Sequence, residues 1–518
     1  MMHRKKLSAL VGVGMTAGLA LGAGETWFVD DDAAGGGDGT TWSTAFDTLD
    51  DALAVARAGD QVWVAQGVYS PATLIDPADM STPSTDPLDA TFYIRKSVKV
   101  YGGFAGNEAT LAERAGLFDQ TILTGMIVLP DGTAGNARHV VFYFSEGNGS
   151  PGRLDGFVVR DGMAGQGTGF GGGGLLAGDL DGPDDNNSVW SVRIDVANCR
   201  FEDNTSESGG GGMLINGPSI LTNTVFVGNT AVGHGGGLAT GIFGANTQLI
   251  GCSFIDNTAG LAGGGFSSRS GGTNTNPYIL NCRFIGNAAG VRGGGFSFAP
   301  NGNNKPMRVF NTLIAQNTAD IGGGVWLQGG RRLNDFATIR PSVTDFGNCT
   351  FADNTATTEG GGLFLGGDAS DGLRAEGDLY TSIIWGNGAP IGPQLSDGSL
   401  AWWSSVQGGW AGGFGNLDVD PMFVNAAERD YRLKMMSPLV DSAISYFAAT
   451  DEYDLDGDGN TSEFVPFDLD GNLRFYDIPF VPNTGADDPA YMDYGALETY
   501  LPSSNAKVGA GTPVFLKR

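Results

Sequence analysis

The sequence predicts an all-β solenoid, and three observations carry this prediction. A motif of the form Phe-x-x-Asn recurs through the middle of the chain, and a run of glycines with an apolar residue follows six of its copies. The copies end at Asn204, Asn229, Asn257, Asn287, Asn317, Asn354 and, in a degraded form, Asn387. Successive asparagines are only 25 to 37 residues apart. A unit this short cannot bury its own core, so the units must stack on one another.

The chain begins with a basic stretch, MMHRKK, and a short apolar run that ends in small residues near Ala23. This pattern is typical of a secretory signal peptide. We therefore expect residues 1–23 to be removed and the protein to be secreted or held at the cell surface. No later stretch is long and apolar enough to span a bilayer, so we expect no transmembrane segment after the signal peptide is removed.

Residues 24–110 are predicted to form an N-terminal cap and the first coils. A helix is expected from Asp47, which can cap its N-terminus, to Gly59, with leucines and alanines on one face. The apolar residues 62–65 read as a strand directly after it. Solenoids need such a cap because their terminal coil would otherwise expose its apolar face.

Between residues 111 and 430 the repeat dominates, and each unit supplies two clear short strands. One strand follows the glycines, and the other leads into the motif, as in Tyr278–Phe284. An asparagine within the second strand, such as Asn281, is expected at a bend because asparagine tolerates left-handed backbone angles. The asparagines of the Phe-x-x-Asn motif are expected to form a second stacked column.

All four cysteines occupy one position of the repeat, two residues before the aromatic residue of the motif. Stacked side chains that point the same way match disulfide geometry poorly. We expect a column of buried free thiols, and a Cys252–Cys282 bridge is the alternative. The cysteines are Cys199, Cys252, Cys282 and Cys349.

The segments between the two strands of a unit vary greatly in length. Because they recur at one position of the repeat, we expect the loops to project from one side of the rod, where repeat proteins carry function. The main insertions are 177–188, 267–276, 328–344 and 366–378.

Residues 431–500 are predicted to be an irregular C-terminal cap with an acidic loop, followed by a tail at 501–518. The loop places three aspartates at alternate positions and a glycine at the sixth, which is the start of an EF-hand-type calcium loop. Val465 stands where that motif has its glutamate, and Glu463 comes two residues earlier. We expect either a solvated acidic turn or a structural Ca²⁺ site made by Asp454, Asp456, Asp458, Asn460 and Glu463.

Charge and composition exclude several classes of function. The net charge of −28 is the wrong sign for a surface that binds nucleic acid. Only His139 and His234 lie outside the leader, which gives little support to Ser-His-Asp catalysis or to histidine-rich metal sites. The glycine runs lack the Lys-Ser/Thr pair of a phosphate-binding loop.

Other candidates for chemistry are weak at the level of sequence. A lyase needs a basic side chain beside acidic ones on a single strand face, and no acids align with the candidate arginines in successive repeats. A cluster of three tryptophans near the last coil is expected to pack in the core or cap rather than to bind sugar. These residues are Arg269, Arg283, Arg292, Arg308, Trp402, Trp403 and Trp410.

Three stretches together resemble a known family. These are the opening Trp27–Pro71, the segment Tyr101–Glu108 and the ending Ser437–Glu498, which closes on Tyr-Gly-Ala-Leu-Glu. They resemble right-handed parallel β-helix proteins of the pectate-lyase-like superfold, and the repeats are similar to those of polymorphic outer-membrane proteins. The resemblance implies a right-handed parallel β-helix with an N-terminal helical cap and an irregular C-terminal cap.

The resemblance is specific for fold and weak for activity, because this fold hosts many functions. We expect a non-catalytic adhesive or envelope scaffold at the cell surface, with no catalytic residues. The alternative is a polysaccharide lyase or glycoside hydrolase that acts on an extracellular polysaccharide. A basic side chain beside clustered carboxylates, in a groove on one strand face, would distinguish the enzyme from the scaffold.

Overall fold

The computed structural model describes residues 24–500, with gaps at 78, 96, 145–149, 166–170, 179–191, 242–245, 271–276, 301–306, 330–341, 369–372 and 486–490. The expected signal peptide, residues 1–23, and the tail, 501–518, lie outside the described residues. The signal peptide therefore stays a prediction from sequence.

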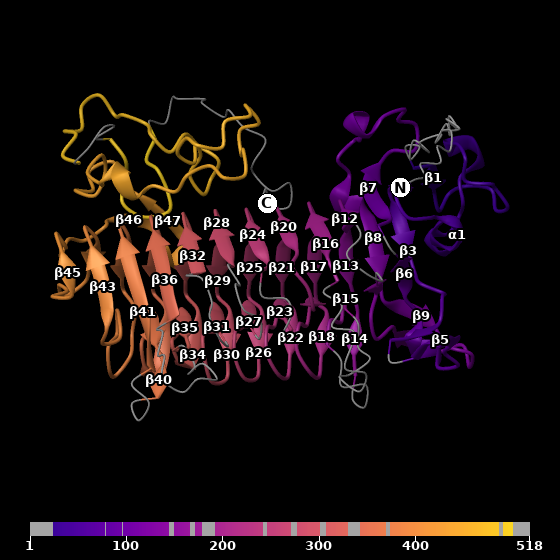
Figure 1. Cartoon of the computed structure of the whole chain (residues 1–518), viewed down its shortest axis with the longest axis horizontal. Helices are drawn as coiled ribbons and strands as arrows, with labels where there is room; N and C mark the ends of the chain where they lie inside the picture. The colour runs from indigo at the N-terminus through magenta and orange to yellow at the C-terminus, as the bar shows by residue number, and fades with distance from the viewer. Residues whose placement is uncertain are drawn as a thin grey trace, which may run out of the picture.

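The chain is a right-handed parallel β-helix, in which four parallel sheets run along a rod (Figure 1). We name them sheets A to D in the order in which the chain visits them in each coil. Sheet A contains β1 (Thr26–Val29), β2 (Gln61–Ala65), β7 (Lys99–Phe104), β12 (Gly152–Asp155), β16 (Ile194–Ala197), β20 (Ile220–Thr222), β24 (Gln248–Ile250), β28 (Tyr278–Leu280), β32 (Met307–Phe310), β36 (Ser342–Gly347), β41 (Leu373–Tyr380), β43 (Ser399–Trp402) and β45 (Gly413–Phe414).

Sheets B and C follow sheet A along each coil. Sheet B contains β3 (Gly67–Tyr69), β8 (Thr121–Thr124), β13 (Val158–Arg160), β17 (Arg200–Glu202), β21 (Val225–Val227), β25 (Ser253–Ile255), β29 (Arg283–Ile285), β33 (Leu313–Ala315), β37 (Thr350–Ala352), β42 (Ile383–Trp385) and β44 (Ser405–Val406). Sheet C contains β14 (Met163–Ala164), β18 (Thr205–Ser206), β22 (Thr230–Ala231), β26 (Thr258–Ala259), β30 (Ala288–Ala289), β34 (Thr318–Ile321) and β38 (Thr355–Glu359).

Sheet D completes the coil, and a few short elements lie outside the four sheets. Sheet D contains β6 (Phe92–Arg95), β11 (Val141–Phe144), β15 (Leu175–Ala177), β19 (Met213–Ile215), β23 (Leu238–Thr240), β27 (Phe266–Ser270), β31 (Phe296–Pro300), β35 (Val325–Leu327) and β39 (Leu363–Leu365). Antiparallel pairs are β4 (Ile75–Asp76) with β5 (Asp79–Pro83), β9 (Met126–Val128) with β10 (Ala134–Asn136), β46 (Phe423–Asn425) with β47 (Asp430–Leu433), and β40 (Gly367–Asp368) with β41. Single 3-10 turns occur at Trp42–Thr44, Pro87–Asp89, Leu111–Glu113, Phe118–Gln120, Ala426–Glu428 and Ser445–Phe447.

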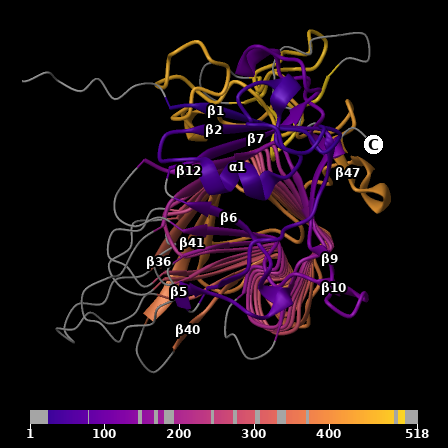
Figure 2. The same cartoon turned by 90° about the vertical axis from the view of Figure 1, so that its right-hand side faces the viewer.

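The expected helix is α1 (Leu49–Val55), and it lies across the N-terminal end of the stack (Figure 2). Its capping residue is Thr48 rather than Asp47, because the Thr48 side chain accepts a hydrogen bond from the Asp51 amide. The helix ends well before Gly59. Its apolar face, centred on Leu49 and Leu53, is buried in the same core as the coils.

Each regular coil has four strands rather than the expected two. In one coil the predicted strand 278–284 is divided into β28 and β29, because Asn281 between them adopts a left-handed conformation with φ of +52°. The two-residue strand β30 follows the motif asparagine and was missed because so short an element has no periodic signal. The bend asparagines share this conformation, as expected, at Asn198, Asn223, Asn281, Asn311 and Asn348.

The column of motif asparagines is confirmed as a buried ladder. The Nδ2 of Asn257 donates to the Oδ1 of Asn287 in the next coil at 2.9 Å and to the carbonyl oxygen of Phe226 in the preceding one at 2.9 Å. Its own Oδ1 accepts from the backbone and side-chain nitrogens of Asn229. Beside the ladder, the motif phenylalanines stack face to face with centroids 4.7 to 5.2 Å apart, at Phe201, Phe226, Phe254 and Phe284.

The four cysteines are free and fully buried, so the expected thiol column is confirmed and the Cys252–Cys282 bridge is absent. Each thiol lies beside the carbonyl oxygen two residues before it, with sulfur–oxygen distances of 3.1 to 3.6 Å. Burial raises the pKa of Cys199 and of Cys349 to about 12. Thiols held in this state are poor nucleophiles, so the column is part of the core.

The connections of a coil differ sharply in length. Two residues join sheet A to sheet B in the regular coils, as between β28 and β29. The connection from sheet D to sheet A takes 7, 6 and 14 residues after β27, β31 and β35. All four expected insertions fall at this connection, although parts of them lie outside the described residues and others belong to β27, β36, β40 and β41.

Residues 415–500, which we call the C-terminal segment, fold back along the outside of the rod over sheets A and B (Figure 1). Tyr453 stacks on Tyr278 of β28 with centroids 5.4 Å apart. The amide of Ala496 donates to Thr350 of β37, and the hydroxyl of Tyr431 donates to Asp353. The segment thus caps the side of the rod rather than its end.

Candidate functional site

The outer face of sheet A is where charged side chains from successive coils come into register. In the first coils Lys99 of β7, Arg153 of β12 and Asp195 of β16 are neighbours across the sheet. Their chain neighbours Val100, Leu154 and Val196 point inward and are fully buried. Alternation along each strand therefore presents the three charged groups to solvent.

These residues line a pocket of about 460 Å³ near the N-terminal end of the rod. Arg114 and Arg153 both contact the buried carboxylate of Asp155, at 2.9 and 2.7 Å. Lys99 forms no ion pair with any described residue. The lining therefore holds three cations against two carboxylates, Asp155 and Asp195, in a chain whose net charge is −28.

A second row of charged residues on neighbouring strands lies toward the other end of sheet A. Arg308 of β32, Asp345 of β36 and Asp378 of β41 are consecutive neighbours. Burial, and then the charge of Asp378, raises the pKa of Asp345, and burial raises that of Asp378. Two adjacent carboxylates beside an arginine form the kind of convergence that sequence could not reveal.

The C-terminal segment supplies acids to the arginines of the rod. Arg308 is held by both oxygens of Glu452, at 2.5 and 3.0 Å, and its guanidinium lies 4.5 Å from the centroid of the Tyr278 ring. Arg283 donates to Asp470 at 2.6 Å and to the carbonyl of Leu469. Neither partner lies in a neighbouring repeat, where the sequence pattern could have indicated it. Glu452 is 144 residues from Arg308 along the chain, and Asp470 is 187 residues from Arg283.

Several of the remaining candidates from the sequence pack against neighbouring residues. Arg292 lies over the ring of Trp326 at 4.8 Å, and the side chain of Arg269 is outside the described residues. His139 is buried with Nδ1 beside the carbonyl of Gly172, and burial lowers its pKa to about 4. His234 is half-buried at a glycine corner. Of the tryptophans, Trp410 packs on the core and Trp403 packs on Phe414 and Phe447.

The acidic loop brings most of its predicted residues together. One oxygen from each of Asp454, Asp456 and Asp458 lies within 4.8 Å of the other two. A second group, with the same limit, joins Asp456 to Glu463 and to Asp451, which the sequence pattern did not include. Asn460 is placed differently, because its oxygen accepts from the amide and hydroxyl of Ser462.

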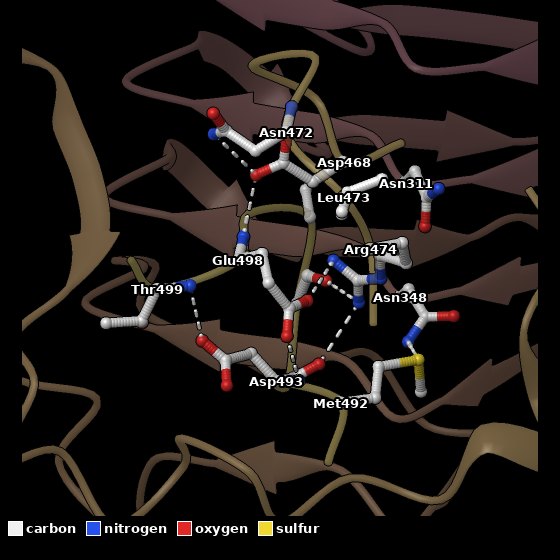
Figure 3. A network of polar contacts seen from close by, with 12 residues as sticks. Asn311, Asn348, Asp468, Asn472, Leu473, Arg474, Met492, Asp493, Glu498 and Thr499 are labelled. Atoms are coloured by element: carbon white, nitrogen blue, oxygen red, sulfur yellow. Dashed lines mark hydrogen bonds and ion pairs between the residues drawn. The ribbon is translucent and has the colours of Figure 1, made fainter. Parts of the chain in front are cut away.

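A buried acidic network holds the C-terminal segment together (Figure 3). Asp441, Asp468, Asp493 and Glu498 are almost fully buried, and Arg474 among them is 1% exposed. Arg474 donates to the carbonyl oxygens of Asp493 and Gly495, and its Nη1 lies 3.6 Å from Glu498. Burial raises the pKa of Asp493 to about 7 and that of Asp441 and of Asp468 to about 6. Because these side chains are almost fully buried, the network forms a polar core of the segment, and Asp468 at its edge also lines a pocket against the rod.

No helix in the described part of the chain has the length and hydropathy needed to cross a bilayer.

No family model matches this chain, and no curated protein matches it. Among solved structures, it is similar to pectate lyase Pel9A, with 10% identity and a TM-score of 0.41 over 92% of this chain and 96% of that one. It is also similar to the PL6 family alginate lyase AlyGC, with 12% identity and a TM-score of 0.30 over 80% of this chain and 57% of that one. Likenesses of this size carry no statement about activity.

Proposed function

We propose that this protein is an exported or cell-surface scaffold that displays loops from a rigid rod and catalyses no reaction. The observation that carries the proposal is the contrast between the connections of a coil. The turn from sheet A to sheet B is kept at two residues, while the connection from sheet D to sheet A varies from 6 to 14 residues across three consecutive coils. Variable loops on a constant frame are how repeat proteins present binding surfaces.

The pairing of the arginines on the rod also favours a scaffold. Arg283 and Arg308 are two of the four arginines considered as the base of an elimination reaction, and each is held by an acid of the C-terminal segment. An arginine engaged in this way is less available to a sugar substrate. The segment instead ties several coils of the rod together.

Loop replacement tests the scaffold. Residues 271–276 and 301–306 are replaced by Gly-Ser sequences of equal length, and binding to immobilised alginate, polygalacturonate and dextran is measured by interferometry. We expect binding to at least one polymer that the replacement abolishes while the melting curve is unchanged. The matched control replaces 130–133, an exposed turn between β9 and β10. Equal binding by the loop variant, or accumulation of cleaved sugar, would overturn the proposal.

The cationic pocket favours a second function, in which the protein is a lyase or hydrolase of a carboxylated extracellular polysaccharide. In an elimination, a base removes the proton next to the sugar carboxylate, the oxygen on the adjacent carbon leaves, and a double bond forms. Lys99, with which no described acid pairs, would act as the base. The nitrogens of Arg114 and Arg153 that do not contact Asp155 would hold the carboxylate. The net negative charge of the rod repels polyanions. Within this pocket, however, cationic side chains outnumber acidic ones, so the local charge is positive.

Ultraviolet absorbance of unsaturated sugars tests the second function with the same polymers. We expect the Lys99→Met and Arg153→Met variants to lose product formation, while Arg193→Met, which removes an exposed arginine outside the pocket lining, retains it. Absence of product from the unaltered protein on every polymer would reject the lyase. Reducing-sugar release without ultraviolet absorbance would identify a hydrolase.

A further inference from the structure

The acidic loop of the C-terminal segment is closed at its base. The amide of Asp451 donates to the carbonyl of Glu463 at 2.8 Å, and Thr450 and Phe464 form an antiparallel bridge just outside them. This closure gathers six acids within 13 residues. Glu452 is neutralised by Arg308, and the other five form no ion pair with any described residue: Asp451, Asp454, Asp456, Asp458 and Glu463.

Asp451 provides an independent sign that a cation belongs in this loop. Its side chain is 0% exposed. Its Oδ2 accepts from the amide of Leu455 at 2.8 Å, but its Oδ1 has no hydrogen-bond partner. A buried carboxylate oxygen without a partner is costly. One oxygen of Asp451 lies within 4.8 Å of an oxygen of Asp456 and of Glu463, where a bound cation would satisfy all three.

We propose that this loop binds one calcium ion through Asp451, Asp456 and Glu463, with Asp454 and Asp458 completing the oxygen set. Calcium takes six to eight oxygens at about 2.3–2.6 Å, so ligand oxygens around one ion are up to about 5 Å apart. This limit is met within each of two groups that share Asp456, one with Asp451 and Glu463 and the other with Asp454 and Asp458. Asp454, Asp456 and Asp458 each accept one backbone amide through Oδ1, which leaves the second oxygen of each for the ion. An irregular, all-oxygen, largely acidic set suits Ca²⁺ better than Mg²⁺, which demands a near-ideal octahedron.

Asn460 has a positioning role in this site. Its side-chain nitrogen Nδ2 donates to Oε2 of Glu463 at 3.0 Å, while its Oδ1 accepts from the backbone amide of Ser462. Glu463 stands in place of the missing glutamate at position 12 of an EF-hand loop. Because Asp451 precedes the motif and Glu463 is brought beside it by the bridge, the site departs from the EF-hand in its ligand order.

The site has a consequence for the rod, because the residues between its ligands are the ones that hold the C-terminal segment to sheet A. Glu452 and Tyr453 lie between Asp451 and Asp454, and they contact Arg308 and Tyr278. A bound ion would therefore fix the loop in the conformation that clamps these coils. This inference does not depend on whether the protein is a scaffold or an enzyme.

Isothermal titration of the mature chain with CaCl₂ tests the site, after removal of metal with a chelator. We expect binding with a dissociation constant of about 0.1–1 mM, the range of extracellular calcium modules, and weaker binding of MgCl₂. The Asp456→Asn and Asp451→Asn variants should each lose affinity at least about tenfold, since each loses a charged ligand. Asp456 is exposed, so its variant tests the site without disturbing the fold.

Hydrogen exchange supplies the second readout. If calcium fixes the loop against sheet A, backbone amides of the loop and of the strands it contacts should become better protected from exchange. Calcium should slow exchange in residues 450–465 and in β28 and β32, and this effect should vanish in Asp456→Asn. The matched control, Glu376→Gln, removes an exposed carboxylate of sheet A and should behave as the unaltered protein. Absence of calcium binding, or equal affinity of Asp456→Asn and the unaltered chain, would overturn the proposal.

Discussion

The coils and the C-terminal segment both contain buried polar side chains, yet these side chains are held in different ways. In the coils, a column of buried polar side chains repeats the same residue from one coil to the next, as in the asparagine ladder through Asn257. In the C-terminal segment, buried charge is concentrated in one aperiodic network around Arg474. The rod therefore pairs buried asparagines with identical residues in the next coil. The C-terminal segment, which clamps the rod, instead gathers its buried charges into a single ionic network.

This difference predicts how damage spreads. A stacked column couples each coil to its neighbours, so a defect in one coil should weaken the coils on either side of it. The ionic network lies within the segment, so a defect there should release the segment while the coils stay folded.

The largest effect is expected from Phe254→Ala in the middle of the phenylalanine stack. Phe254 is fully buried and stacks on Phe226 and Phe284 at 4.8 and 4.7 Å. Removing a buried ring leaves a cavity, and we expect a loss of about 4 kcal/mol of local stability. Hydrogen exchange should show faster opening of the coils on both sides. Phe480→Ala is the control, since that ring is 65% exposed, and equal effects of the two changes would contradict the prediction.

A somewhat smaller and more local effect is expected from Arg474→Met. The change keeps the volume of the side chain but removes the cation from among four buried carboxylates, which should cost about 3 kcal/mol. Peptides covering 437–485 and 491–500 should lose protection from exchange, while peptides of the coils keep theirs.

Arg432→Met is the matched control for this change, because Arg432 is 54% exposed and pairs with Asp430 of its own strand. It should alter exchange little. Loss of protection throughout the coils of Arg474→Met would mean that the segment is not an independent unit, and the comparison between the two regions would fail.

The acidic network should also make the C-terminal segment sensitive to pH. Burial raises the pKa of Asp441 and of Asp468 to about 6 and that of Asp493 to about 7, and it raises the pKa of Glu498 as well. The folded segment therefore binds more protons than the unfolded chain between about pH 4 and pH 7, and its stability falls as the pH rises through this window. We therefore expect the segment to lose protection from exchange between pH 5 and pH 8.

Exchange rates corrected for their intrinsic pH dependence measure this loss, in the presence of a chelator so that bound calcium does not oppose it. Asp493→Asn removes a group whose pKa is raised to about 7 and should flatten the profile. Glu376→Gln, on the exposed face of sheet A, should leave the profile unchanged. A segment that becomes more stable from pH 5 to pH 8 would contradict the raised pKa values.

The comparison also explains how much of the molecule the sequence could predict. The asparagine ladder, the free thiol column and the bend asparagines were predicted because each recurs at a fixed position, and stacking turns a recurring position into a column. The strands of sheet C were not predicted. A two-residue strand such as β30 (Ala288–Ala289) is too short to show a periodic pattern of apolar residues. The bend at Asn281 was predicted. The resulting division of residues 278–284 into two strands in different sheets was not predicted.

The candidate site was far less predictable than the fold. Asp454, Asp456 and Asp458 were found because their spacing within one loop is informative. Asp451 was missed, because only the bridge between Thr450 and Phe464 brings it to Glu463. The cationic pocket depends on register between strands that are more than 40 residues apart, as Lys99 and Arg153 are, and nothing in either local sequence indicates it.

The smallest effect is expected where the C-terminal segment meets the rod through exposed charges. Arg429 donates to both oxygens of Asp256 at 2.7 and 3.1 Å, but the two side chains are 39% and 50% exposed. Solvent screens such a pair, so Arg429→Ala should cost only about 0.5 kcal/mol. Exchange in residues 253–258 and 426–432 measures the change, and raising the salt concentration should reduce the difference from the unaltered chain. A loss comparable to that of Arg474→Met would show that surface pairs, rather than the buried network, hold the segment in place.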